Sequence, residues 1–191
     1  MSCHMAFAAI ITARKDSIRI PGKNRAKVGG FELWHRSAMF AVQCGISPII
    51  DSDDEGILIL ARTMGFTVHQ RTTPSEDQGG THWQAIQAVA KDYGLSRYAL
   101  LQPTSPFRSQ PIMTACLREL DKGNAKAILT TYAKGDKWDG NIGIFSDSDN
   151  KVPESFHAIR NGWVQSFQVD EPRDLQEARH LEKLLPNGGL W

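Results

Sequence analysis

At 191 residues, with 41% hydrophobic and 23% charged residues, the chain has the size and composition of a globular protein, and we expect a single domain over residues 1–191 with a disordered start at 1–5. The net charge of +1 excludes a global electrostatic attraction to nucleic acid or to an anionic membrane. No apolar run is long enough to cross a bilayer, and the first residues are too few and too polar for a signal peptide, so the predicted compartment is the cytoplasm.

Strand-like and helix-like segments alternate along the chain. Short apolar runs predict strands, and apolar residues at helical spacing predict helices. In order, we expect a strand at 7–11, a helix at 33–44, a strand at 48–50, a helix at 54–64, a strand at 66–69, a helix at 81–93, a strand at 98–101, a helix at 109–122, strands at 127–131, 141–145 and 164–169, and a helix at 172–185, with residues 147–161 mostly loop. This alternation indicates an α/β fold with mostly parallel strands and right-handed crossovers.

Two helix starts carry capping signals. Ser52 or Asp53 is expected to cap the helix at 54–64, and Thr81 with Gln84 has the spacing of a capping box. The histidines show no metal-ligand spacing, and we interpret all of them as structural or surface residues: His4, His35, His69, His82, His157 and His180.

The first predicted strand runs directly into a basic loop. Four cations stand against one acid: Arg14, Lys15, Arg19 and Lys23 against Asp16. A loop at the carboxyl end of a parallel strand lies where open α/β sheets bind ligands, and this charge favours a polyanion such as a nucleoside triphosphate. The spacing is not that of a Walker loop, and the alternative interpretation is a surface loop whose charges are simply solvated.

The segment ARKDSIRIPGKN resembles the A-R-G-G-S-K-R-I-P-G-K-N signature of the CMP-sugar synthetases, the cytidylyltransferases that activate sialic acid and related acid sugars. Lys15, Asp16 and Ile18 depart from it, so the glycine pair that lets backbone N–H groups approach phosphate is missing. The resemblance implies catalytic roles for Arg14 and Lys23. It also implies nucleotide contacts for Ala13, Ser17, Arg19 and Asn24.

A second stretch, LLQPTSPFR at 100–108, follows another predicted strand. Its two prolines stiffen the loop, and its polar side chains suit a base, a ribose or a sugar carboxylate. Taken alone, it is better explained as a stiff connector without a ligand. However, it is similar to the family's L-L-Q-P-T-S-P-L-R motif and follows the first motif in the same order. The resemblance implies substrate or nucleotide contacts for Gln102, Pro103, Thr104, Ser105 and Arg108.

Residues 51–54, DSDD, occupy the place of the family's S-T-D-D/S stretch. The resemblance implies a helix-capping and nucleotide-flanking role for Ser52 and Asp53, although Asp51 departs from the family's serine. Asp51 and Asp53 also look like the D-x-D motif with which many glycosyltransferases hold Mg²⁺ or Mn²⁺. An acidic helix start without any ligand is the third interpretation.

Arg71 resembles the arginine of the family's R-P motif, although Thr72 replaces the proline. The resemblance implies that Arg71 lies near the nucleotide. Asp77 is either a further site residue of the same segment or an ordinary loop acid.

The expected metal site lies near the end of the chain. VDEPRDL at 169–175 resembles the family's I-D-I-D-T-x-x-D-L, in which two aspartates hold the catalytic Mg²⁺. Asp170 falls on the second aspartate and Gln168 on the first. The resemblance therefore implies Mg²⁺ at Asp170, with nucleotide phosphates and water as further ligands, or impaired metal handling. Asp174 is expected to start the last helix rather than to bind metal.

Residues 139–145, DGNIGIF, look like the family's N-G-a-i-Y stretch, which shapes the acid-sugar pocket, with the order changed to Gly-Asn. Between Tyr132 and Trp138 the chain is much shorter than in family members, where a longer excursion forms an arm over the partner subunit. We therefore expect a monomer or a weak homodimer.

Together, the resemblance implies a three-layer, Rossmann-like nucleotidyltransferase fold and the transfer of CMP from CTP to an acid sugar, either sialic-acid-like or another 2-keto-3-deoxy sugar acid, with release of pyrophosphate. The expected cofactor is Mg²⁺, and the expected partners are CTP and the acid sugar, without nucleic acid or membrane. Two other functions stay open. One is a glycosyltransferase-like enzyme with a metal on Asp51 and Asp53. The other is a non-catalytic nucleotide-binding relative, which the missing arm and the departures at Lys15, Asp16, Ile18 and Gln168 motivate.

Overall fold

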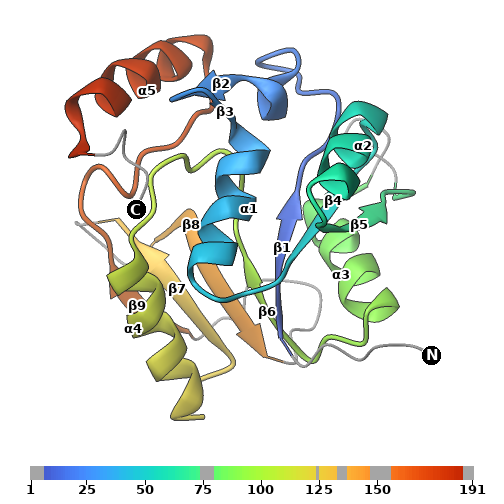
Figure 1. Cartoon of the computed structure of the whole chain (residues 1–191). Coiled ribbons are helices and arrows are strands. Elements are labelled where there is room, and N and C mark those ends of the chain that lie inside the picture. Colours follow the sequence, from blue (N-terminus) through green and yellow to red (C-terminus); the bar gives the residue numbers. More distant parts are fainter. Residues whose placement is uncertain (1–6, 74–79, 124, 133–136, 147–155, 187–191) are drawn as a thin grey trace.

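The computed structural model describes residues 7–73, 80–123, 125–132, 137–146 and 156–186, and within them a seven-stranded sheet has the order β5-β4-β1-β6-β8-β7-β9 (Figure 1). Its strands are β1 (Ala8–Thr12), β4 (Pro48–Ser52), β5 (Thr67–Gln70), β6 (Arg97–Leu100), β7 (Ala127–Thr131), β8 (Trp138–Ser146) and β9 (His157–Arg160). A separate hairpin pairs β2 (Lys27–Val28) with β3 (Phe31–Glu32). The helices are η1 (Lys23–Arg25, a 3-10 turn), α1 (Leu33–Gln43), α2 (Glu55–Thr63), α3 (His82–Asp92), α4 (Gln110–Asp121) and α5 (Pro172–Leu184).

Strand β1 lies at the point where the strand order reverses. The chain leaves β1 toward β4 on one side and later returns to β6 on its other side, and β1 runs parallel to both. Loops that follow β1 and β6 therefore diverge at the carboxyl edge, which is where open α/β sheets form ligand clefts. The sheet is mostly parallel, as predicted, and β8 is antiparallel to its neighbours β6 and β7.

Helices cover both faces of the sheet and give it three layers (Figure 1). Alternate residues of β1 point to opposite faces: Ile11 packs with α1, α2 and α4, whereas Ile10 packs with α3. All five residues of β1 are buried. This explains why the strand reads as a continuous apolar run rather than as an alternating pattern.

A third apolar cluster holds α5 against the carboxyl edge of the sheet. Phe107 from the loop after β6, Val169 before α5 and Ala178 on α5 pack together with Ile20 from the loop after β1. Arg179 Nε also donates to Lys27 O of β2 at 3.0 Å, and Figure 1 shows α5 beside the β2–β3 hairpin at the end toward which β1 points. The last helix thus brings the segment around residue 170 next to the first loop.

Two predicted elements are wrong. Residues 164–169, predicted as a strand, begin in a turn in which Ser166 N donates to Gly162 O at 3.1 Å, and they belong to neither of the described sheets. The apolar residues Val164, Phe167 and Val169 pack under α5 instead of pairing in a sheet. Conversely, β9 lies in a segment predicted as mostly loop, because parallel pairing with β7 outweighs its polar composition. The other predicted strands and helices are confirmed to within a few residues.

The two predicted caps differ in outcome. The capping box of α3 is confirmed, since Thr81 Oγ1 accepts from Gln84 N and Gln84 Oε1 accepts from Thr81 N at 2.8 Å. Helix α2 is capped by Asp54, not by Ser52 or Asp53. Asp54 Oδ1 accepts from Gly56 N at 2.9 Å, because Ser52 still belongs to β4.

Some predictions concern residues outside the described ranges: the disorder of residues 1–5, the role of Asp77, and the segment 133–136 where an arm would start. Within the described ranges, no helix is both long enough and apolar enough to cross a membrane.

Candidate active site

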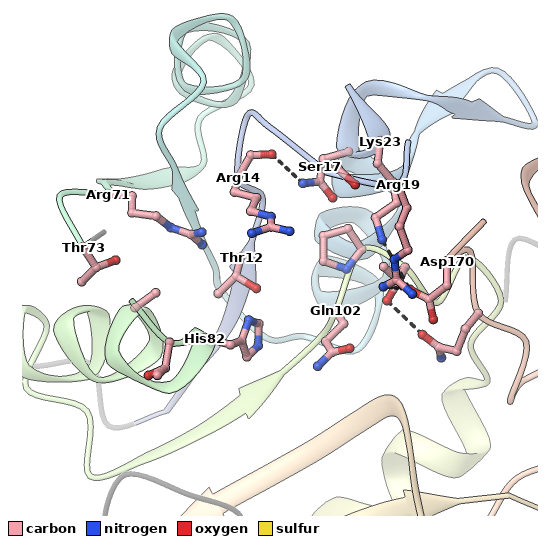
Figure 2. A pocket seen from close by; sticks show the side chains of 16 residues that line it. Thr12, Arg14, Ser17, Arg19, Lys23, Arg71, Thr73, His82, Gln102 and Asp170 are labelled. Carbon is pink, nitrogen blue, oxygen red and sulfur yellow. Dashed lines mark hydrogen bonds and ion pairs between the residues drawn. The ribbon is translucent and has the colours of Figure 1, made fainter. Parts of the chain in front are cut away.

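A cleft of about 370 Å³ opens at the carboxyl edge of the sheet, between the loops that follow β1 and β6. Most of the residues predicted for the site line it: Arg14, Ser17, Arg19, Lys23, Asn24, Arg71, Gln102, Pro103, Thr104 and Asp170. In the view of Figure 2, Arg19, Lys23 and Asp170 gather at one end, Arg71 and His82 lie at the other, and Arg14 stands between them. Three cations of the predicted loop, Arg14, Arg19 and Lys23, therefore line one cavity, whereas Lys15 is exposed and does not line it.

Lys23 is the most enclosed cation of the loop, with 9% of its surface exposed. Gly22, at φ 63°, makes the left-handed turn that starts η1 and directs the lysine inward. Lys23 Nζ donates to Val169 O at 3.3 Å and to Asp170 Oδ1 at 3.4 Å. Burial lowers the pKa of Lys23 and the nearby Arg19 adds to this, whereas the carboxylate of Asp170 raises it.

Asp170 is shared between two cations. Its Oδ1 accepts from Arg19 Nη2 at 3.0 Å as well as from Lys23, and 42% of its side chain is exposed to the cleft and solvent. The role predicted for Asp174 is confirmed, because its Oδ2 accepts from the backbone N–H groups of Asp170 and Glu171 at 2.9 and 2.7 Å at the start of α5. This turn fixes Asp170 at the mouth of the cleft.

Gln168 also lines the cleft, and its amide ties the loop after β6 to the start of β8. Its Nε2 donates to Ser105 Oγ at 2.5 Å and to Asp139 O at 2.7 Å, and its Oε1 accepts from Thr104 Oγ1 at 2.9 Å. Ser105 is fully buried and donates to Gly140 O at 3.2 Å. It does not line the cleft, so its predicted substrate or nucleotide contact is corrected to a structural role. Where the family pattern has a carboxylate, this chain has a cross-linking amide.

Side-chain hydrogen bonds hold the loop after β1, in which Lys15 and Asp16 replace the glycine pair of the family signature. Asn24 Nδ2 donates to Arg14 O at 2.8 Å, which is one of the bonds drawn in Figure 2. On the other side, Lys15 N donates to Asp53 Oδ1 at 2.5 Å. Two side chains thus hold the single peptide group that joins Arg14 to Lys15, one at its C=O and the other at its N–H.

Ala13 and Ser52 support the cleft from below and do not line it. Both are fully buried, and Ser52 Oγ donates to Ala13 O at 2.5 Å and accepts from Asp54 N at 3.0 Å. The predicted nucleotide contact of the Ser52 side chain is therefore corrected to a structural one. Its hydroxyl is consumed at the junction of β1 and β4.

The predicted substrate contact of Arg108 is also corrected. Only 4% of this residue is exposed, and its guanidinium donates to Asn141 O at 3.2 Å, to Ser105 O at 2.7 Å, to Ser37 Oγ at 3.0 Å and to Gln102 O. Burial is the main cause that lowers the pKa of Arg108 to about 9. Arg108 holds the loop after β6 in place, and through it the side chain of Gln102.

Asp51 and Asp53 do not form the metal-binding pair of a D-x-D motif. Asp51 is fully buried, its Oδ1 faces His69 Nδ1 at 2.9 Å, and its Oδ2 accepts from Arg71 Nε at 2.8 Å and from Arg71 Nη2. Asp53 is used by Lys15 N. Among the described residues, no group of three or more His, Cys, Asp or Glu side chains is arranged to hold a metal ion.

Sequence reasoning missed several lining residues: Thr12, Thr73, Thr81, His82 and Ala85. His82, interpreted above as structural or surface, is the first residue of α3 and faces the cleft. A signal for this was available. The capping box at Thr81 marks a helix N-terminus that follows a strand of the parallel sheet, and such N-termini lie at the ligand-binding edge.

Comparisons with known proteins identify the fold and the family of the chain. Three solved structures share the fold: a CMP:2-keto-3-deoxy-manno-octonic acid synthetase complexed with CTP (14% identity, TM-score 0.77, covering 94% of this chain and 99% of that one), a cytidylyltransferase from Leptospira borgpetersenii (16%, 0.70, 97% and 90%) and a 4-diphosphocytidyl-2C-methyl-D-erythritol synthase from Anaerococcus prevotii (14%, 0.68, 93% and 98%). No curated protein matches the sequence. The cytidylyltransferase family model matches residues 8–183, so the chain belongs to the cytidylyltransferase family.

Proposed function

We propose that the chain transfers CMP from CTP to an acid sugar of the sialic-acid or 2-keto-3-deoxy type and releases pyrophosphate. One observation carries this proposal: Arg14 and Lys23 line the same cleft as Gln102. A cationic loop that faces a polar loop across one cavity offers a triphosphate its counter-charges and offers the rest of the nucleotide neutral hydrogen-bonding groups. The resemblance of both loops to the acid-sugar branch of the family supports the choice of substrate.

In this reaction the sugar hydroxyl attacks the α-phosphorus in line, its proton passes to a base or to water, and the bond from the α-phosphorus to the bridging oxygen breaks. Negative charge builds up on the α-phosphate and on the departing pyrophosphate. Arg14 and Lys23 would offset this charge from fixed positions. Because Lys23 is largely shielded from water, its interaction with phosphate is stronger than that of a surface lysine.

Asp170 is the residue that would hold Mg²⁺. Magnesium is commonly bound through one or two carboxylates together with substrate phosphates and water, so a single accessible carboxylate beside a triphosphate site fits it. When bound, the ion supplies additional neutralisation of phosphate charge. Gln168 would contribute no charge, and its amide oxygen already accepts from Thr104.

Pyrophosphate release, measured with CTP, Mg²⁺ and a panel of sialic-acid-type and 2-keto-3-deoxy sugar acids, tests the proposal. Removing one fixed cation from a transition state commonly costs about 10²–10³-fold in rate, and we expect Lys23→Ala to lose this much with the best sugar. Lys122→Ala, which removes an exposed lysine from the far end of α4, is the matched control. Wild-type-like release from Lys23→Ala would refute the assignment.

A non-catalytic nucleotide-binding relative is the second candidate. Two observations favour it. Gln168 stands where the family motif has its first aspartate, and Arg19 and Lys23 both form ion pairs with Asp170. CTP binding without turnover on any sugar would support it.

The cytoplasm, where CTP and magnesium are plentiful, remains the predicted compartment, and a monomer or weak homodimer remains the predicted assembly.

A further inference from the structure

A fully buried carboxylate stands directly behind the cleft. Asp51, at the end of β4, has no exposed surface, and its two oxygens serve different partners. Oδ2 accepts from Nε and Nη2 of Arg71, and Oδ1 faces Nδ1 of His69. The other ring nitrogen of His69 faces Asp92 Oδ2 at 3.2 Å, at the end of α3. The four side chains form a row from the surface of the protein to the cleft.

Arg71 is the end of this row that reaches the cleft. Its backbone N donates to Ser52 O at 2.9 Å, which extends the pairing of β4 and β5 by one residue, and its side chain is only 11% exposed. Figure 2 shows the guanidinium pointing into the cleft, toward the side of Arg14. The pairing with Asp51 uses Nε and Nη2, which leaves Nη1 as the part of the fork that does not bind the aspartate.

A long arginine side chain has many rotamers, and fixing it on ligand binding costs roughly 1–2 kcal/mol of conformational entropy. A buried carboxylate that binds one edge of the guanidinium removes this freedom before any ligand arrives. The arrangement is demanding, because a buried aspartate is stable only if its charge is matched. Arg71 supplies the matching positive charge here, and Nδ1 of His69 lies 2.9 Å from the second oxygen of Asp51.

We infer that Asp51 is a positioning residue for the nucleotide site: it holds the guanidinium of Arg71 in the cleft so that the remaining N–H groups meet the nucleotide without reorganisation. His69 fixes the second oxygen of Asp51 and so orients the carboxylate. This inference rests on the proposed nucleotide site. It assigns to Asp51 a role different from both the metal ligand and the helix-start acid considered from the sequence.

The experiment is a double-mutant cycle with two measurements. Asp51→Asn, Arg71→Gln and the double variant are compared with wild type, and Asp121→Asn makes the same chemical change on an exposed residue of α4 as a control. The mobility of the Arg71 side chain is measured by ¹⁵N relaxation of its Nε–H in the protein without ligand. CTP affinity is measured by calorimetry below the unfolding temperature of each variant, with UTP, ATP and GTP as alternative nucleotides.

We expect Asp51→Asn to make the Arg71 Nε–H mobile and to weaken CTP binding about tenfold, as for the loss of one charge-assisted contact. Because Asp51 acts through Arg71, the double variant should bind CTP no more weakly than Arg71→Gln alone. If Asp51 only stabilised the fold, the two substitutions would weaken CTP binding independently, and their factors would multiply in the double variant. Multiplying effects, or an Arg71 side chain that stays rigid in Asp51→Asn, would overturn the inference.

Two further outcomes are covered. If wild type binds none of the nucleotides, the proposed function fails, while the relaxation of the Arg71 Nε–H still decides whether Asp51 holds that side chain. If Asp51→Asn does not fold, Arg71→Lys replaces it, since this variant keeps the charge next to Asp51 but has no second edge for a ligand. Arg71→Lys should then bind CTP about tenfold more weakly at nearly unchanged thermal stability, and native affinity would overturn the inference.

Discussion

Lys23 Nζ lies 3.4 Å from Asp170 Oδ1, although 147 positions separate the two residues in the sequence. The contact joins the first loop of the protein to the segment before its last helix, across the mouth of the cleft. It also gives the cleft an internal counter-ion where the proposed ligand would bring phosphate oxygens. A triphosphate must therefore compete with Asp170 for Lys23 and Arg19, or share them through a metal ion.

This competition predicts that Asp170→Asn has opposite effects with and without Mg²⁺. Without the metal, the variant should bind CTP several-fold more tightly, because a carboxylate that repels phosphate is gone. With the metal, turnover should fall about 10²-fold, because the proposed protein ligand is lost. Calorimetry and pyrophosphate release, each measured with Mg²⁺ and with EDTA, separate the two effects. An unchanged magnesium dependence would contradict the role proposed for Asp170.

Gln168→Asp should allow turnover at lower Mg²⁺ concentrations than the wild type needs. The substitution places a second carboxylate two residues from Asp170, and we expect the magnesium concentration needed for half-maximal turnover to fall about tenfold. It also removes the bonds that the amide donates to Ser105 Oγ and Asp139 O, so the melting temperature should drop. Gln168→Ala loses the same bonds without adding charge. If both variants shift the metal dependence equally, the prediction is wrong.

The stability of the protein should decrease as the pH rises above about 6.5, through the titration of His69. Its hydrogen bond to Asp51 is the main cause that raises its pKa, Asp92 adds to this, and burial opposes it. Because the folded pKa lies above the unfolded value of 6.5, the protonated ring stabilises the native state fully below that value, and the contribution is lost as the pH passes the folded pKa. Thermal melts from about pH 5.5 to 8.5 should show this slope, and His69→Gln should flatten it. Equal slopes in the two proteins would exclude His69 as the cause.

Arg108→Met should unfold more easily and bind CTP more weakly for an indirect reason. The backbone carbonyls of Gln102, Ser105 and Asn141 would lose their shared donor inside the protein. Unsatisfied buried groups cost about 1–3 kcal/mol each, so we expect a loss of about 3 kcal/mol, or a melting temperature lower by roughly 6–12 °C. Arg118→Met on the exposed face of α4 is the control, with a change expected within about 0.5 kcal/mol. A melting temperature of Arg108→Met close to wild type would show that the loop does not depend on this arginine.

Sequence patterns were informative where local chemistry decides the structure. The buried run of β1 and the capping box at Thr81 each depend on neighbours within a few residues, and both are confirmed. The same patterns failed for residues 164–169. Their apolar side chains carry no information on whether a sheet edge or the underside of α5 is the surface that buries them.

The candidate site shows the same difference between features set by local sequence and features set by long-range contacts. The sequence by itself determined that a cationic run and a proline-stiffened polar run each follow a buried strand, because these are local features, and the two family-like motifs indicated that both loops belong to one site. Only the tertiary structure decided which side chains reach the cleft, since Arg108, Ser52 and Asp51 are as polar as Arg14, Gln102 and Asp170 but are buried and do not line it. The physical reason is that a buried polar group needs a hydrogen-bond partner, and the fold supplies that partner from a distant part of the chain. Residues close to the group in the sequence therefore do not reveal which partner it has.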